Sequence, residues 1–290
     1  DWVDKPYATG FRSAARCTTV LGNHFFNLRD AIGISGNQSL IQDNLIEDMG
    51  NDGIDVVASD VVIRRNRIRS GRHTPAEPLH PDAIQGWTAP GATNRNVEID
   101  ANSIINLNPA PDNGLQGISI FDGKWDGLRV TNNLVITNAG HCIALFGVTN
   151  AAIANNTVIP ARPDVPCWLM IHPAKDNTPS RRVLVRNNIA AQIIVQGETL
   201  TVDHNIAEQK ISIENDGQLQ ATAGMIDEKN IIDPSIFHSF VGFDPVRGRF
   251  DLRPGAQSPA ARGGAGEDAP KLDIEGRPRV PPVDIGAYGR

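Results

Sequence analysis

Short aliphatic runs alternate with polar residues along most of the chain, and many of these runs end on an asparagine. The recurring pattern is two aliphatic residues separated by one position, one or two variable residues, an asparagine, and a further aliphatic residue. It occurs eight times, at Asn23, Asn44, Asn66, Asn102, Asn133, Asn156, Asn188 and Asn205. Alternation with a period of two predicts short strands rather than helices.

The spacing of these motifs indicates a repeat. Successive asparagines lie between 17 and 36 residues apart, and the insertions fall between motifs and never inside them. Strands of about four to six residues bury too little surface alone, whereas stacked coils pair each strand in parallel with its copy about 4.8 Å away. We therefore predict a parallel β-solenoid of about eight coils, with the asparagines hydrogen-bonded in one column. We also expect the repeated asparagine to adopt the left-handed conformation that its short side chain tolerates.

The repeat over roughly residues 15–206 resembles the right-handed parallel β-helix family, which has the pectate-lyase-like fold. The resemblance implies an all-β, right-handed parallel β-helix over residues 1–206. Residues 207–290 include Phe250-Asp251-Leu252 and Asp284-Ile285-Gly286-Ala287-Tyr288, which resemble the tail of many secreted bacterial β-helix proteins. We expect this segment to be an excursion and C-terminal cap of the same domain, because an open parallel edge invites pairing with another chain.

Composition excludes several classes of protein. The formal net charge of −6 argues against a general nucleic-acid binder, and no apolar run approaches the roughly 20 residues of a membrane helix. Three cysteines allow at most one bridge within the chain. The sequence opens at Asp1 without a leader, so we expect a processed or trimmed chain. The resemblance implies a secreted, periplasmic or cell-surface location, and the oligomeric state has no signal in the sequence.

The strands that precede five of the motifs align as rows within 51–57, 81–87, 115–121, 140–146 and 166–172. Their inward column is Ile54, Ile84, Ile118, Ile143 and Leu169, and their outward neighbours are Asp55, Gln85, Ser119, Ala144 and Met170. Two residues further, a second outward column contains Val57, Trp87, Phe121, Phe146 and His172. The bend before each strand carries Asp52, Asp82, Gln116 and His141.

Long insertions, among them 69–79 and 106–113, flank this strand on both sides and predict a groove along the solenoid. Aromatic rings in a groove suit sugar rings, and stacked exposed aromatics are uncommon without a binding role. The predicted substrate-binding residues are Asp55, Gln85, Trp87, Gln116, Phe121, Lys124, Trp125, Phe146 and His172. The expected partner is thus a polysaccharide.

Two carboxylates on adjacent coils suggest glycosidic hydrolysis. Asp52 and Asp82 should stand roughly 5 Å apart by strand spacing, and hydrolysis needs one protonated and one ionised carboxyl group. The segment from Asn51 to Asp55 resembles the N-T-D-G-x-D signature of polygalacturonase-type glycoside hydrolases, which implies catalytic roles for Asp52 and Asp82. This chain departs from that family where Gln116 replaces a histidine, and it lacks a clear Arg-x-Lys element.

A second reading is β-elimination or epimerisation of a uronic acid by proton abstraction. His80, His141 or Lys124 would be the base. The substrate carboxylate would be neutralised by Gln85, by Gln116, or by calcium held by Asp52, Asp55 and Asp82. The segment from His80 to Gln85 resembles, with a different residue order, the Asp-Pro-His segment of alginate epimerases.

A third reading is a glycan-binding β-helix without catalysis. The sequence favours an enzyme that cleaves an extracellular or cell-wall-type glycan, acidic in character, by hydrolysis. The candidate catalytic residues are Asp52, Asp82, His80 and His141, and the hydrolytic reading requires no cofactor.

Overall fold

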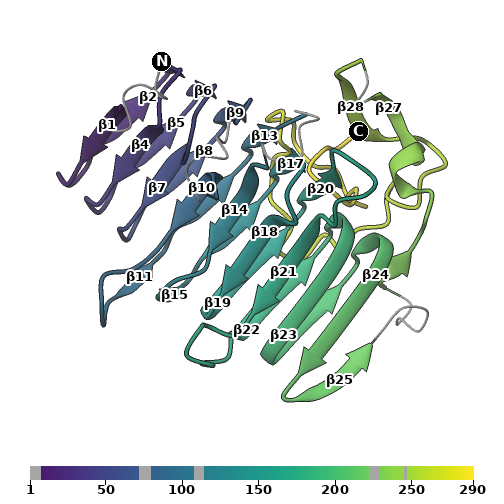
Figure 1. The fold of residues 1–290 in the computed structure, drawn as a ribbon. Coiled ribbons are helices and arrows are strands. Elements are labelled where there is room, and N and C mark those ends of the chain that lie inside the picture. The colour runs from purple at the N-terminus through teal and green to yellow at the C-terminus, as the bar shows by residue number, and fades with distance from the viewer. Residues whose placement is uncertain (1–7, 72–79, 108–113, 222–228, 245–246) are drawn as a thin grey trace.

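The computed structural model describes residues 8–71, 80–107, 114–221, 229–244 and 247–290, so parts of the predicted insertions, 72–79 and 108–113, lie outside the described residues. The chain winds into an elongated solenoid of parallel strands, as predicted (Figure 1). Each coil contributes one short strand to each of three stacks of parallel strands, which form the three faces of the solenoid. A bend after every few residues turns the chain from one face to the next.

The first stack forms the face that carries the candidate site. Its strands pair in parallel in the order of the chain. They are β1 (Thr9–Ser13), β4 (Asp30–Ile34), β7 (Ile54–Val56), β10 (Asp82–Gly86), β14 (Gln116–Ile120), β18 (His141–Phe146) and β21 (Trp168–His172).

The other two stacks follow the same order. The second contains β2 (Thr19–Leu21), β5 (Leu40–Gln42), β8 (Val62–Arg64), β12 (Glu98–Asp100), β16 (Arg129–Thr131), β19 (Val148–Ala154) and β22 (Arg181–Arg186). The third contains β3 (His24–Phe26), β6 (Leu45–Glu47), β9 (Arg67–Arg69), β13 (Ser103–Ile105), β17 (Leu134–Thr137) and β20 (Thr157–Pro160). Two further strands, β11 (Thr93–Arg95) and β15 (Lys124–Asp126), pair beside the second stack.

Parallel pairing continues past residue 206, where the sequence places the end of the β-helix. β23 (Ile189–Asp203) runs through all three stacks, and β24 (Ile206–Asn215) pairs with it in parallel. β26 (Ile231–Ile232) then pairs in parallel with the start of β24. Only β25 (Gln218–Ala221) reverses direction against β24. The coils therefore extend into the segment that the sequence predicts to be an excursion.

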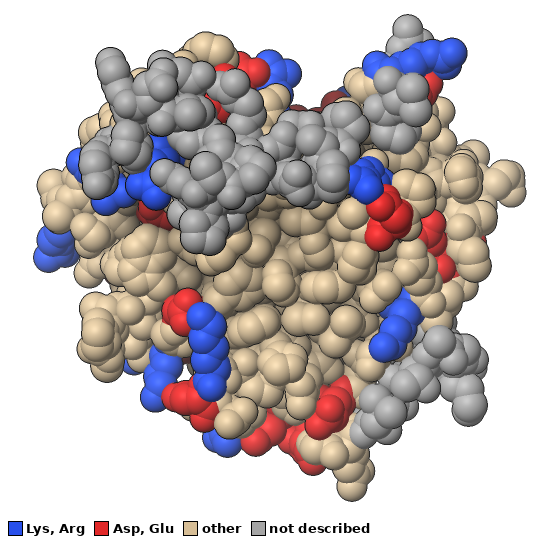
Figure 2. Space-filling model, viewed as in Figure 1, with Lys and Arg blue, Asp and Glu red and all other residues tan. Residues whose placement is uncertain are grey.

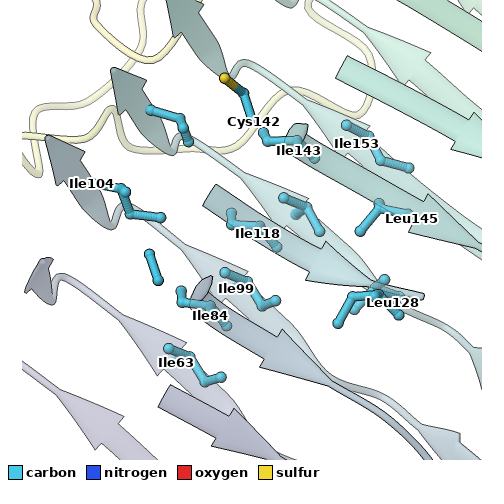
Figure 3. Packing of buried hydrophobic residues seen from close by; sticks show 14 of the residues in the cluster. Ile63, Ile84, Ile99, Ile104, Ile118, Leu128, Cys142, Ile143, Leu145 and Ile153 are labelled. Atoms are coloured by element: carbon cyan, nitrogen blue, oxygen red, sulfur yellow. The ribbon is translucent and has the colours of Figure 1, made fainter. Parts of the chain in front are cut away.

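The solenoid is filled by columns of aliphatic side chains, shown in Figure 3. The predicted inward column from Ile54 to Leu169 is confirmed, because all five of its members are fully buried and lie opposite one another across the strands. Burial of one such side chain contributes about 1.5–3 kcal/mol. Aliphatic side chains that stack on equivalent side chains of the next coil thus form one continuous core along the solenoid.

The repeated asparagines form a hydrogen-bonded ladder, which confirms the predicted column. In each coil the Asn side-chain Nδ2 donates to Oδ1 of the next ladder residue at 2.9–3.1 Å, from Asn23 to Asn230. The same Oδ1 also accepts the backbone N–H of the preceding ladder residue. Each inner asparagine therefore satisfies buried backbone groups at a bend as well as its own side chain.

The left-handed residue of each bend is the one before the ladder asparagine, which corrects our expectation. Positive φ values of 53–57° occur at Asp43, Arg65, Ala101, Asn132, Asn155, Asn187 and His204. The ladder asparagines keep the ordinary conformation, since their task is to hydrogen-bond inward. The preceding position needs only a residue that tolerates the left-handed region, so its identity varies.

Residues 258–290 lie along the flank of the solenoid, whereas the sequence predicts a cap over its end. Asn132, Asn155 and Asn187 donate side-chain hydrogen bonds to the backbone of this tail at 3.0, 3.1 and 2.8 Å. The tail also covers outward aliphatic residues of the third stack, including Leu134, Ile136, Ile159 and Ile189. The coils whose motif reads Asn-Asn are thus those that hold the tail.

The region between β26 and the tail contains the 3-10 helix η2 (Ile236–Ser239) and a hairpin of β27 (Phe240–Asp244) and β28 (Arg249–Pro254). In the part of the chain that the structure describes, no helix is long and apolar enough to cross a membrane. Cys142 and Cys167, on successive coils, form the single disulfide that the sequence allows.

The ladder makes a direct prediction for stability. Asn133→Ala should lower the free energy of unfolding by about 2–4 kcal/mol, because it leaves buried partners on two neighbouring coils unsatisfied. Asn23→Ala is the matched control: Asn23 is exposed at the first position and, among the described residues, accepts no bond from an earlier coil, so its replacement should cost less than about 1 kcal/mol. Urea unfolding of both variants checks this, and equal losses would contradict a cooperative ladder.

Candidate active site

The first stack aligns the outward residues in register. Asp55 lies opposite Gly33 on one side and Gln85 on the other, and Ser119, Ala144 and Met170 continue this column. Over β14, β18 and β21 the column is uncharged, and Figure 2 shows that the centre of this face is mostly tan with the charged residues at its margin. Four buried acidic residues, Asp30, Asp52, Asp55 and Asp82, lie on the N-terminal coils of the same face.

A pocket of about 540 Å³ opens over these N-terminal coils. Its floor carries Asp30, Asp52 and Asp55, and its walls carry Arg12, Arg29 and Trp87, together with Ser13, Ala14, Gly33, Ile34, Ser35, Asn51 and Val57. The pocket joins strands β1, β4 and β7 to the end of β10, so it exists only because consecutive coils stack. Of the predicted catalytic carboxylates, it exposes Asp52 but not Asp82.

Asp52 and Asp55 are nearly buried, at 7% and 8% exposure. Burial, followed by the negative charges of Asp55 and Asp82, raises the pKa of Asp52 to about 8. Burial, followed by the charge of Asp30, raises the pKa of Asp55 to about 7, while Arg12 opposes the rise. Asp55 Oδ1 has no hydrogen-bond partner among the described residues. Near neutral pH, therefore, Asp52 mostly keeps its proton, Asp55 is close to the midpoint of its titration, and Asp55 Oδ1 is a free acceptor.

The hydrogen bonds of Asp52 fix its side chain. Its Oδ1 accepts the backbone N–H of Asp82 at 3.0 Å, and its Oδ2 accepts Nδ2 of Asn51 at 2.8 Å. The same Asn51 group donates to Asp30 Oδ1 at 2.8 Å. One amide thus holds two carboxylates of adjacent coils at a fixed distance from each other.

Asp82 is not among the residues that line this pocket, and its predicted catalytic role stays a prediction. Its side chain is 0% exposed, and burial raises its pKa while His80 opposes the rise. His80 Nδ1 lies 3.4 Å from Asp82 Oδ2, and this carboxylate raises the pKa of His80 to about 9. Gln85 also donates to Asp82 Oδ2, at 3.2 Å. Asp82 thus acts on Asp52 through its charge and through its backbone N–H.

His141 lies in an aromatic cluster. Its ring centroid is 5.0 Å from Phe121 and 5.3 Å from Trp168, both in edge-on arrangements. Burial lowers the pKa of His141, with Asp82 opposing, so the imidazole is neutral at neutral pH. Gln116 lies between the two coils of Asp82 and His141 and accepts the Ser119 hydroxyl at 3.3 Å. The structure therefore brings Asp82, Gln116 and His141 into one column, as predicted.

The predicted aromatic column is continuous on the later coils. The ring of Phe146 is 5.1 Å from Phe121 and 5.2 Å from His172, and all three are partly exposed. Trp87 is 36% exposed and lines the acidic pocket. Trp125, predicted to bind substrate, is instead a core residue: it is 1% exposed, and its indole N–H donates to the Asp122 carbonyl at 3.2 Å.

Two smaller hollows continue the acidic pocket along the solenoid. The first, of about 210 Å³, is lined by Gln85, Gly86, Trp87, Phe121 and Asp122. The second, of about 330 Å³, is lined by Phe121, Asp122, Lys124 and Lys175 with the loops around them. Trp87 lines both the acidic pocket and the first hollow, and Phe121 and Asp122 line both hollows. The three together form a groove across the coils.

Comparison with known proteins agrees with this architecture. The family model described as "Right handed beta helix region" matches residues 9–158, which is more than half of the chain. The chain belongs to the right-handed β-helix family. No curated protein matches the sequence. The crystal structure of pectate lyase Pel9A aligns over 97% of this chain and 76% of its own, at 11% identity and a TM-score of 0.48.

Asp30 lines the pocket but is not among the predicted site residues, because the aligned rows begin one coil later, at residue 51. Asp30 begins β4 as Asp82 begins β10, and Asp52 stands two residues before β7, so the bend column starts one coil earlier than the rows that revealed it. Extending the alignment by one coil would have found Asp30. Arg12 and Arg29 carry no repeat signal, because the aligned positions on the next coil are Gly33 and Asn51 rather than arginines.

The predicted calcium ligands do not form an evident metal centre. Among the residues that the structure describes, no three His, Cys, Asp or Glu side chains are arranged to hold a metal ion. Both side-chain oxygens of Asp52 already accept hydrogen bonds, from the backbone N–H of Asp82 and from Asn51 Nδ2. Calcium binding by Asp52, Asp55 and Asp82 stays a prediction, and no step proposed below depends on it.

The raised pKa of Asp52 predicts how stability changes with pH. An acid whose folded pKa lies above its unfolded value stabilises the fold while it is protonated, and this contribution is lost as pH rises from about 4 to 8. Asp52→Asn keeps the neutral form at every pH. Its free energy of unfolding, relative to wild type, should therefore rise by about 1 kcal/mol or more between pH 5 and pH 8.

Urea unfolding at several pH values checks this prediction. Asp216→Asn serves as the control, because Asp216 is exposed and far from the pocket in sequence. A difference between Asp52→Asn and wild type that stays constant with pH would contradict the account of the pocket.

Proposed function

We propose that this protein hydrolyses glycosidic bonds of an acidic polysaccharide, with Asp52 as the general acid and Asp55 as the general base or nucleophile. The observation that carries the proposal is the pair of carboxyl groups that open to one pocket with pKa values raised to about 8 and 7. Glycosidic hydrolysis uses one carboxyl group that keeps its proton and a second that gives one up. Asp52 keeps its proton to higher pH than Asp55 does, and Asp55 has a free acceptor atom, Oδ1.

The groove supports a polymeric substrate. The acidic pocket is continuous with two hollows that run across later coils, and Trp87 and Phe121 lie where the hollows meet. Aromatic rings offer an apolar surface that suits the C–H faces of sugar rings. In this proposal Gln85, Phe146, Lys124 and His172 contact the polymer beyond the cleavage point, whereas Asp82 is a positioning residue that acts on Asp52 through its charge and its backbone N–H.

The competing reaction is proton abstraction by a histidine, as in a lyase or an epimerase. His80 suits this role poorly, since its pKa of about 9 keeps it protonated at neutral pH. His141 is neutral, but rings of Phe121 and Trp168 flank it. These features favour hydrolysis as the reaction of this pocket.

We further propose that the protein acts outside the cytoplasm. A disulfide between Cys142 and Cys167 persists in oxidising compartments, and an extracellular glycan would be found there. The proposed hydrolysis uses protein carboxyl groups alone, so it requires no cofactor.

The direct test is incubation with a panel of acidic and neutral polysaccharides. Reducing ends and the ultraviolet absorbance of unsaturated sugars are measured in the same samples. Hydrolysis predicts new reducing ends without absorbance. Reducing ends with absorbance would show a lyase instead, and neither signal on the whole panel would contradict cleavage.

The variants then assign roles. Asp52→Asn and Asp55→Asn should each lower kcat by about 10²–10⁴-fold, because each removes a general acid or base. Asp82→Asn should lower kcat less, and it should move the alkaline limb of the pH profile to lower pH, since losing a nearby negative charge lowers the pKa of Asp52. Asp216→Asn again serves as the control. A pH profile that does not change in Asp82→Asn would contradict its positioning role.

A further inference from the structure

Arg12 lies across a glycine on the floor of the acidic pocket. It stands opposite Gly33, which in turn stands opposite Asp55, so the three residues form one outward column on β1, β4 and β7. A Cβ atom at residue 33 would lie 3.1 Å from Arg12 Cγ and 3.6 Å from its Cδ and Nε. The bare glycine therefore leaves the space through which Arg12 extends toward the carboxyl groups.

The guanidinium of Arg12 is only lightly engaged by the protein. Within the described residues it donates one hydrogen bond, from Nη2 to Asp30 Oδ2, at the long distance of 3.4 Å. The Arg12 side chain is 63% exposed, whereas that of Asp30 is 10% exposed. A guanidinium has five N–H donors in a planar fork. Most of its hydrogen-bonding capacity thus remains available at the wall of the pocket.

The charge of the pocket leaves Arg12 effective as a cation. Arg12 and Arg29 both line the pocket beside Asp30, Asp52 and Asp55. Burial raises the pKa of Asp52 to about 8 and that of Asp55 to about 7, so these groups carry less negative charge near neutral pH than their number suggests. An anion can therefore approach Arg12 without strong repulsion from the floor.

We propose that Arg12, extended over Gly33, binds the carboxylate of a uronic acid residue and selects acidic over neutral glycans at this end of the groove. The planar guanidinium fork matches a carboxylate in geometry and charge. The inference rests on the proposed function and adds to it the residue that determines specificity. It also places an acidic sugar next to Asp55 on the N-terminal coils.

The test compares two ligands that differ only in charge. An acidic oligosaccharide and the same oligosaccharide with its carboxyl groups reduced to alcohols are titrated calorimetrically into Asp52→Asn, which blocks turnover. The Asp52→Asn protein should bind the acidic oligomer about 10-fold or more tightly than the reduced one, as expected for a charge-assisted hydrogen bond. Adding Arg12→Gln should remove this preference while leaving affinity for the reduced oligomer unchanged.

Two further variants separate the contact from its side effects. Arg16→Gln removes the same charge from the same end of the solenoid, outside the pocket, where Arg16 donates to Gln38 at 2.8 Å, and it should keep the preference. Gly33→Leu should abolish the preference without changing any charge, because a side chain at residue 33 displaces Arg12.

The outcomes distinguish this inference from the proposed function. If Arg12→Gln keeps the preference for the acidic oligomer, Arg12 is not the specificity residue, although the enzyme can still be a glycoside hydrolase. If Arg16→Gln loses the preference for the acidic oligomer to the same extent, the preference comes from the overall positive charge of this end of the solenoid, and the inference is wrong. If neither oligomer binds and the wild-type protein cleaves no glycan on the panel, the proposed function fails and this inference fails with it.

Discussion

In-register stacking of parallel strands is the constraint on which the rest of this structure depends. Each coil places its residues directly above those of the coil before, about 4.8 Å away, so any residue type that recurs in the sequence becomes a column in space. Where the recurring residue is isoleucine, the column is core. Where it is asparagine, the column is a ladder that satisfies the backbone at every bend. A shift by one residue in any coil would break both columns at once.

The same rule brings aspartates together, and for charged groups stacking is unfavourable. Asp30, Asp52 and Asp82 occupy equivalent positions on successive coils, and Asp55 is on the same face. Like charges at strand spacing repel, and burial removes the water that would otherwise stabilise them. The least costly response is to keep protons bound, which is the state that a general acid requires. The fold thus turns an unfavourable column into carboxyl groups that exchange protons near neutral pH.

The regular features could be predicted from the sequence because they repeat. The asparagine ladder, the inward column from Ile54 to Leu169 and the alignment of Asp82, Gln116 and His141 all follow from aligning short rows. The solvent exposure of individual side chains could not be predicted by aligning the repeats. Asp52 and Asp82 share a position in the repeat, yet only Asp52 lines the pocket, because the exposure of a side chain depends on the atoms packed around it and not on its place in the repeat. Trp125 is expected to bind substrate but is buried, and Arg12 has no arginine at the aligned position of the next coil.

The central claim is that the pocket holds carboxyl groups that keep their protons near neutral pH, and it can be measured directly. Carbon-13 chemical shifts of the carboxyl carbons, in protein labelled at aspartate, report each titration, and Asp52→Asn and Asp55→Asn assign the two signals. We predict apparent pKa values near 8 and 7 for the pair. Titration of every aspartate below about pH 5, as in exposed carboxylates, would contradict the account.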